Sequence, residues 1–184
     1  MPAPWGGKNL PEQWGGRVMS EVERSYAMKT QEIILRSFTM KLYTIGYTKK
    51  SAQEFFETLK KNGVKRILDV RESNSNLFAG FTMKQNIGYF LKEICNIDYQ
   101  ELKILAPTKD IRLKFHDSGY KEWETFKNGY NELLKTRDLK NQIDKNLLED
   151  AALLCFEPTA DHCHRRLAAE HLKEIYPDLE IVHL

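Results

Sequence analysis

The chain has 184 residues, 29% of them charged, and a formal net charge of +2 at pH 7. This length suits one α/β domain with a sizeable core and is too short for two ordinary domains. The charge is too small for the strong basic stripe of a protein dedicated to nucleic acid, and no apolar stretch reaches the length of a membrane-spanning helix. The three cysteines lack metal-type CxxC spacing and no secretory signal opens the chain, so we expect a cytoplasmic protein.

Residues 1–39 are predicted to form an N-terminal arm or extension, partly helical, that precedes a single domain over residues 40–184. Proline, glycine and tryptophan dominate Met1–Arg17, a composition that resists assignment to any regular element. Ser20–Phe38 is predicted to be a helix, because Ser20 is a suitable cap and Glu23 follows three residues later. The simplest interpretation is a surface arm without chemistry.

The domain itself begins with a strand, a helix and a second strand. Met40–Tyr47 is rich in β-branched and aromatic residues, and its Gly46 allows close approach to a neighbour or a ligand. Ser51 with Glu54 predicts a capping box and hence a helix, and Lys65–Arg71 predicts the next strand. Strand, helix and strand within about thirty residues indicate a right-handed βαβ unit with parallel strands.

The rest of the chain continues this alternation, which predicts a three-layer α/β/α fold with a mostly parallel sheet of about five strands, Rossmann-like or flavodoxin-like. The further predicted elements are a long polar loop after Arg71, a helix over Lys84–Cys95, a strand over Tyr99–Leu105, helices over Lys109–Phe115, Tyr120–Leu134 and Leu139–Leu148, a strand over Ala152–Phe156, a helix capped by Thr159 with Asp161 in its first turn, and a strand over Glu180–Leu184.

Ligands of parallel sheets bind outside the carboxyl ends of the strands. The first two strands carry Gly46 with Tyr47 and Asp69 with Arg71 at those ends, and the strand over 152–156 is followed by Glu157. Alternation along a strand also sends Asp69 and Arg71 to the same side. We therefore expect these side chains to share one crevice.

The stretch LLCFEPTADHCHRRLAAEHL, residues 153–172, runs from a strand into a helix and predicts an anion site at the corner. Free backbone amides and the positive end of the helix dipole point there. Arg71 and Arg165 can each give two parallel hydrogen bonds to a phosphate or carboxylate. The alternative is an internal salt-bridge network with Asp69 and Glu157, and the two interpretations are compatible.

The same corner holds further candidates for chemistry. Cys163, at a helix start beside arginines, suits a thiolate nucleophile, although it also shares a buried stripe with Leu167 as a small core residue. His164 suits a general acid or base tuned by Glu157, and the plain alternative is a histidine hydrogen-bonded to backbone. His162 and His164 diverge around the helix and no second ligand cluster is present, so we expect no metal and no cofactor.

TIGYTKKSAQEFFETLKKNGVKRILDVR and the later HCHR element resemble the family called domain of unknown function 488, over Met40–Leu184. The resemblance implies a three-layer α/β fold and a shared pocket, but no agreed reaction. After Arg71 the chain departs from the family, because Glu72–Asn76 stands where many members carry a proline and a serine-arginine pair. That departure removes the basis for carrying over phosphate contacts in this loop. The matching positions are Gly46, Asp69, Val70, Arg71, Glu157, His162, Cys163, His164 and Arg165.

These observations lead to a first hypothesis: the protein binds an anionic, phosphate-bearing, nucleotide-like ligand at the carboxyl edge of the sheet and acts on it as a hydrolase or transferase. The alternative is a non-catalytic module that binds nucleic acid or a partner protein through the same edge, the Asn-rich loop and the arm. A third interpretation makes the charged network purely structural. The sequence leaves open the substrate, the oligomeric state and whether the protein is an enzyme. The candidate catalytic residues are Asp69, Glu157 and His164, and the candidate ligand-binding residues are Gly46, Tyr47, Arg71, Cys163 and Arg165.

Overall fold

The structure, a computed structural model, describes residues 13–14, 17–18, 20–38, 40–74 and 77–184, and only the backbone at 13–14, 17–18, 31–38 and 77–78. It divides into two compact units, Met1–Thr39 and Met40–Leu184, which are described separately. None of the described helices combines the length and the apolar character needed to cross a membrane.

In the first unit, β1 (Gln13–Trp14) pairs antiparallel with β2 (Arg17–Val18), within and just after the stretch Met1–Arg17 that the sequence left unassigned. The predicted helix is confirmed as α1 (Glu21–Phe38). Its capping box is present, since the Ser20 amide donates to Glu23 Oε2 over 2.9 Å and the Glu23 amide donates to Ser20 Oγ over 3.3 Å. The rest of the Pro- and Gly-rich start lies outside the described residues.

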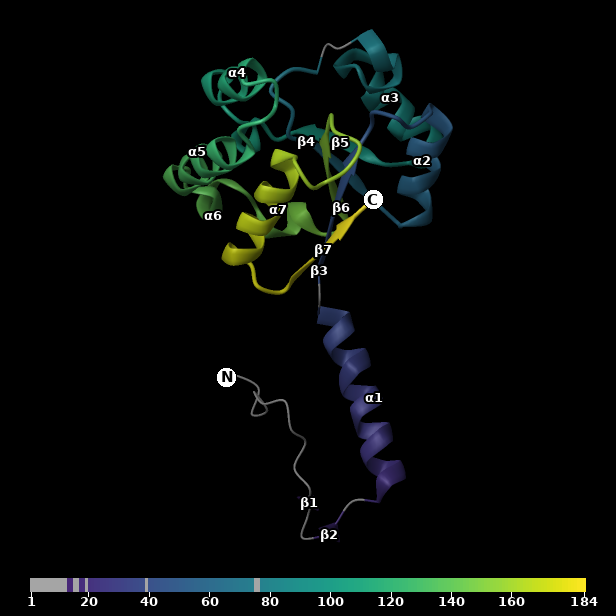
Figure 1. Ribbon diagram of the computed structural model, residues 1–184. Helices are drawn as coiled ribbons and strands as arrows, with labels where there is room; N and C mark the ends of the chain where they lie inside the picture. Colours follow the sequence, from purple (N-terminus) through teal and green to yellow (C-terminus); the bar gives the residue numbers. More distant parts are fainter. Residues whose placement is uncertain (1–12, 15–16, 19, 39, 75–76) are drawn as a thin grey trace. The chain divides into compact units, whose positions relative to one another are not determined.

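The second unit is built on an all-parallel sheet with the order β5-β4-β6-β3-β7 (Figure 1). The three-layer α/β prediction is confirmed. The strand order differs from the Rossmann and flavodoxin orders, because β6 lies between the first two strands of the unit. Those two strands are parallel as predicted but are not neighbours. The strands are β3 (Met40–Gly46), β4 (Arg66–Asp69), β5 (Asp98–Glu101), β6 (Ala151–Cys155) and β7 (Leu179–His183).

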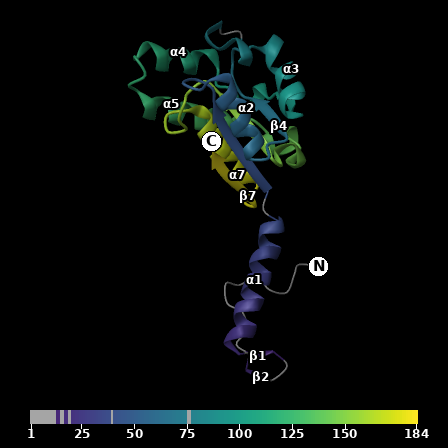
Figure 2. The ribbon, with the colours of Figure 1, turned by 90° about the vertical axis from the view of Figure 1, so that its right-hand side faces the viewer.

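Alternate residues of the central strands enter two separate cores, one on each face of the sheet. Leu68 and Leu153 pack toward α5, α6 and α7, whereas Ile67 and Leu154 pack toward α2 and α3. Figure 1 shows these two helical layers on opposite sides of the sheet, and α7 lies beside β7 in both Figure 1 and Figure 2. The helices are α2 (Ala52–Lys61), α3 (Lys84–Cys95), α4 (Lys109–Asp117), α5 (Trp123–Thr136), α6 (Leu139–Gln142) and α7 (His164–Ile175).

Three of the predicted segments, a strand, a loop and a helix, each contain a short 3-10 helix in the structure. The strand expected to reach Leu105 ends at Glu101, and η2 (Lys103–Leu105) follows, where the Arg137 guanidinium donates to the Ile104 and Ala106 carbonyls. The polar loop after Arg71 contains η1 (Leu77–Thr82). The single helix expected over Leu139–Leu148 is α6 and then η3 (Lys145–Leu148), because the Asp144 side chain caps the Asn146 amide.

The helix of the predicted corner begins later than expected. Thr159 does not cap it, and Asp161 is not in its first turn, since α7 starts at His164 with Cys163 as the N-cap residue. The preceding residues are instead held in a loop, in which the Cys163 amide donates to the Ala160 carbonyl and the Arg165 guanidinium donates to the Glu157 carbonyl over 2.7 Å. These bonds stabilise the loop in place of a first helical turn.

Candidate functional site

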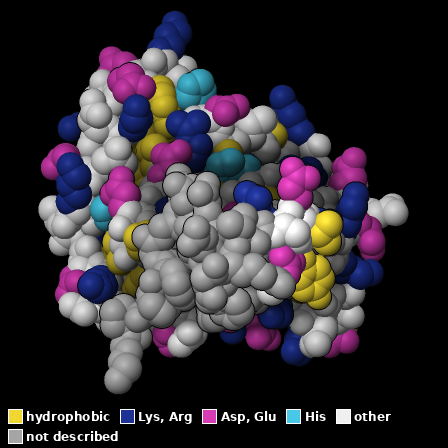
Figure 3. Space-filling model, turned by 90° about the horizontal axis from the view of Figure 1, so that it is seen from below, with side chains coloured by type: hydrophobic (Ala, Val, Ile, Leu, Met, Phe, Trp, Pro, Cys, Tyr) yellow, Lys and Arg dark blue, Asp and Glu magenta, His cyan; other side chains and the backbone are white. Residues whose placement is uncertain are grey.

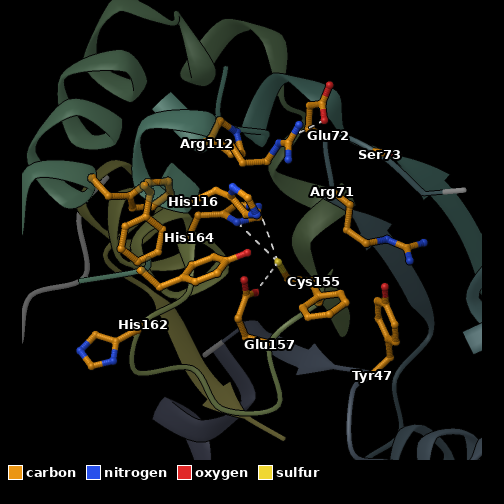
Figure 4. A pocket seen from close by; sticks show the side chains of 15 residues that line it. Tyr47, Arg71, Glu72, Ser73, Arg112, His116, Cys155, Glu157, His162 and His164 are labelled. Carbon is orange, nitrogen blue, oxygen red and sulfur yellow. Dashed lines mark hydrogen bonds and ion pairs between the residues drawn. The ribbon is translucent and has the colours of Figure 1, made fainter. Parts of the chain in front are cut away.

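A cavity of about 340 Å³ opens at the carboxyl edge of the sheet, between the loops after β3, β4 and β6 and the α4–α5 region (Figure 4). Its volume lies in the range of small-molecule sites. Aromatic side chains form much of its wall, while charged groups and imidazoles reach it from several elements. The aromatic residues are Tyr47, Phe115, Tyr120, Phe126 and Phe156; the ionisable ones include Arg71, Glu72, Arg112, His116, Glu157, His162 and His164.

The floor of this cavity combines a thiol, a carboxylate and an imidazole. Cys155 ends β6 on the same face as Leu153, so its side chain points toward α5 and α7. Its Sγ lies 3.0 Å from Glu157 Oε2 and 3.5 Å from His164 Nδ1. Cys163, just behind the floor, donates to the same Glu157 oxygen over 2.9 Å. Two thiols therefore share one carboxylate oxygen.

Burial decides the protonation of the sulfurs. It raises the pKa of Cys155 and raises the pKa of Cys163 well above the usual thiol value, so both are thiols in the protein as it stands. Burial also opposes ionisation of Glu157, but hydrogen bonds from Cys163 and Cys155 outweigh it and lower the pKa of this carboxyl. The result is a carboxylate held by two weak thiol donors.

His164 is 9% exposed, and its ring is fixed from two sides. Nε2 lies 3.0 Å from the Val70 carbonyl, and the ring meets Tyr130 edge-on with 5.7 Å between centroids. Burial alone would lower the pKa of His164, but contacts with Cys163, the Val70 carbonyl and Glu157 raise it. The bond to Val70 matches the plain backbone interpretation of this histidine and leaves Nδ1 facing the thiols.

Arg71 lines the cavity but is already engaged behind it. Its Nε and Nη2 donate to the two oxygens of Asp69 over 2.8 and 2.6 Å, and Nη2 also donates to the Thr82 carbonyl. The guanidinium lies over the Tyr47 ring, 5.2 Å from its centroid. Asp69 is fully buried and accepts a further bond from the Tyr99 hydroxyl, so it holds Arg71 rather than facing the cavity. The interpretation of these two residues as an internal ion pair is correct.

Arg112 is the cationic side chain at the mouth. It extends from α4, and its Nε lies 3.3 Å from Glu72 Oε2, with the two side chains 44% and 34% exposed. Figure 4 shows its guanidinium above the floor beside Glu72. His116 and His162 also line the cavity, and the His162 ring meets Trp123 edge-on with 5.1 Å between centroids.

Arg165 lies beneath the site and is fully buried. Its guanidinium reaches the main-chain carbonyl of Glu157 instead of the carboxylate. Gly46 makes room for this contact, because a Cβ atom there would lie 1.7 Å from the Glu157 carbonyl oxygen and 3.2 Å from Arg165 Nη1. The close neighbour anticipated at Gly46 is thus the Glu157 backbone.

The structure brings the sequence-predicted residues together at one edge but in two shells. Tyr47, Arg71, Glu157 and His164 line the cavity, whereas Gly46, Asp69, Cys163 and Arg165 lie behind it. Sequence reasoning placed Cys155 within the predicted strand over Ala152–Phe156, without a role at the site, and passed over Arg112 and His116. Cys155 could have been found from strand alternation, since it stands two residues before Glu157; Arg112 and His116 carry no comparable signal because helix packing alone brings them there. Cys155, Arg112 and His116 are among the cavity residues that sequence reasoning overlooked.

Comparison with known proteins gives one match. The family model described as "Domain of unknown function DUF488" matches residues 51–172, a segment that runs from the cap of α2 into α7. The comparisons with curated proteins and with solved structures found no match.

Proposed function

Because this chain belongs to the DUF488 family, whose description names no reaction, we propose a function from the cavity itself: it binds a small, phosphate-bearing, nucleotide-like anion. The observation that carries the proposal is the excess of cationic and imidazole groups over carboxylates around an aromatic-walled cavity. Among the residues that line the cavity, Arg71, Arg112 and three histidines stand beside two carboxylates, Glu72 and Glu157, and Asp69 behind the wall pairs with Arg71. Such a site attracts an anion with an apolar or aromatic part.

Arg112 is the proposed anion contact. Its ion pair with Glu72 is half exposed, and pairs of this kind contribute little stability, so the guanidinium can exchange Glu72 for a ligand. A phosphate or carboxylate can accept two parallel hydrogen bonds from a guanidinium. The present contact with Glu72 is a single, partly exposed ion pair, so a ligand can bind Arg112 more strongly than Glu72 does. Arg71 is held in place by Asp69 and Thr82, and Asp69 balances its charge, so Arg112 is the guanidinium available to the ligand.

The aromatic wall is the proposed contact for the rest of the ligand. Tyr47 and Phe156 meet edge-on with 5.4 Å between ring centroids, and Phe156 is 43% exposed. An exposed phenyl face beside a cationic mouth suits a base or another flat ring, because stacking tolerates any π-face. A nucleotide-like molecule satisfies both halves of the site at once.

A hydrolase or transferase acting on such a ligand would work at the cavity floor. Glu157 and His164 lie there, and they are the candidate catalytic residues that face the ligand. Asp69, being fully buried behind Arg71, is a positioning residue in this proposal. Turnover is tested separately from binding, by following release of inorganic phosphate from nucleoside monophosphates.

A module that binds nucleic acid is the alternative function. On the face drawn in Figure 3, which is seen from below, acidic and basic side chains are interspersed, so the described part of that face carries no continuous basic stripe. Its distinguishing property is oligonucleotide binding whose logarithmic affinity falls linearly with the logarithm of salt concentration. Binding of that kind without mononucleotide binding would select the alternative.

The test is thermal melting of protein kept in a chelator, with inorganic phosphate and with nucleoside monophosphates. A ligand at a hundred times its dissociation constant adds about 2.7 kcal/mol of stability. We expect a mononucleotide to raise the melting temperature of wild type, and Arg112→Ala to lose most of that shift. The matched control is Lys135→Ala, which removes a cation of α5 that pairs with Glu132 over 2.7 Å and does not line the cavity. Equal shifts in all three proteins, or no shift in wild type, would refute the proposal.

A further inference from the structure

The cavity floor contains a compact set of metal-binding atoms. One ligand atom each from Cys155, Cys163 and His164 lie within 4.8 Å of one another, and all three residues are buried. We propose that these residues bind one Zn²⁺ ion, with Glu157 beside it and one coordination position open to the cavity. Two thiolates and an imidazole are the ligands that zinc prefers, and this set with an open position is typical of catalytic zinc.

The distances suit a tetrahedral ion. Zinc bonds of about 2.3 Å to sulfur and about 2.0 Å to nitrogen place two ligands of one ion about 3.5 Å apart. The separation of Cys155 Sγ and His164 Nδ1 is 3.5 Å. Ligating histidines usually direct their second ring nitrogen to a carbonyl or carboxylate, and here Nε2 lies 3.0 Å from the Val70 carbonyl.

The surroundings of Glu157 supply an independent reason for a cation. Within the part of the chain that the structure describes, no lysine or arginine forms an ion pair with the Glu157 carboxylate. Its oxygen is contacted instead by the Cys155 and Cys163 thiols, which are weak donors. The Glu157 carboxylate is therefore held by hydrogen bonds without a lysine or arginine among the described residues to neutralise its charge, and a divalent ion bound to the same two sulfurs would neutralise it.

Ordinary core packing explains this cluster less well. Free cysteine is often a small core residue surrounded by apolar groups. Cys155 and Cys163 instead meet a carboxylate and an imidazole, and Cys163 stands at the N-cap of α7, where the helix dipole favours negative charge such as a metal-bound thiolate.

The zinc site deepens the anion-binding proposal and rests on it only for the ligand that would occupy the open position. A zinc ion at the floor would supply an electrophile beneath the anion held by Arg112. In the zinc-bound protein His164 is a ligand and does not shuttle protons. Metal binding is measured without any anion, and anion binding is measured in chelator, so failure of one proposal is distinguishable from failure of the other.

The test is titration of reduced, metal-free protein with Co²⁺, followed by displacement with Zn²⁺. We expect one ion per chain, thiolate-to-cobalt charge-transfer bands in the near ultraviolet, and intense visible bands of a tetrahedral site. Cys155→Ser and Cys163→Ser should each lower the charge-transfer intensity to about half, because one thiolate ligand remains, and should weaken binding by more than the roughly 10- to 100-fold that loss of an outer-shell partner costs. The control is Cys95→Ser, whose thiol on α3 contacts the Phe56 carbonyl outside the cluster and should leave the spectrum unchanged.

A second measurement on wild-type protein does not depend on how the variants fold. Zinc should protect Cys155 and Cys163, but not Cys95, from alkylation in mild denaturant, as read by peptide mass spectrometry. Cobalt bands without sulfur charge transfer, stoichiometry well below one, or alkylation of the cluster cysteines at the same rate with and without zinc would each overturn the proposal.

Discussion

Replacement of Gly46 by alanine tests the packing that holds the site together. The added Cβ would lie 1.7 Å from the Glu157 carbonyl oxygen, whereas carbon and oxygen in contact stay about 3.3 Å apart, so the two backbones must separate by about 1.6 Å. The obstacle is main chain and cannot rotate away. The same oxygen accepts the 2.7 Å bond from the buried Arg165 guanidinium, and that bond would be lost or stretched.

The expected cost follows from this contact. Loss of a hydrogen bond to a buried charged group costs about 1.5 to 3 kcal/mol, and displacement of the backbone adds to it, so we expect Gly46→Ala to lose about 2 to 4 kcal/mol. For a domain of this size that corresponds to a fall in melting temperature of roughly 5 to 15 °C. The measurement is urea unfolding followed by circular dichroism, which gives the free energy directly.

The matched control is Gly129→Ala. This glycine lies within α5 and has nothing within 4 Å of the position of a Cβ atom. Alanine in a helix interior is favoured over glycine by roughly 0.5 to 1 kcal/mol, so the control should be stabilised. Opposite signs for the same substitution would establish that the contact at Gly46, and not loss of glycine as such, is responsible. A Gly46→Ala protein as stable as wild type would refute the reasoning.

Three further changes test other parts of the structure. The hydrogen bond from Lys84 is the largest influence on Glu101 and lowers the pKa of this carboxyl to about 2, so the ionised Glu101 contributes stability above pH 4.5 that is lost as the pH falls toward 2. Glu101→Gln should therefore lose less melting temperature than wild type between pH 4.5 and 2, and an equal loss in both proteins would contradict this assignment. The fully buried Tyr130 donates its hydroxyl to the Leu105 carbonyl over 2.5 Å, and Tyr130→Phe should cost about 0.5 to 1.5 kcal/mol in urea unfolding. Ser51→Ala removes the capping box of α2 and should cost about 1 kcal/mol by the same assay, whereas an unchanged midpoint would show that the cap is dispensable.

The sequence alone determined most of the elements and their layering, because local rules decide them. The capping box at Ser51, the strand composition after Met40 and the alternation of strands with helices each depend on residues close together in the chain. Family membership likewise follows from local motifs, and the family model covers 51–172. The sequence also predicted that the candidate residues gather at the carboxyl edge, since parallel strands place their ends together.

Only the tertiary structure decided which side chains meet at that edge. The start of α7 moved to His164 because Arg165 and the Glu157 carbonyl stabilise a loop in place of a first turn, a contact between groups that helix propensity does not consider. Insertion of β6 between β3 and β4 brought Cys155 beside His164, and docking of α4 brought Arg112 over the floor. Contacts of this kind depend on how distant segments pack, and a pattern along one chain does not contain that information.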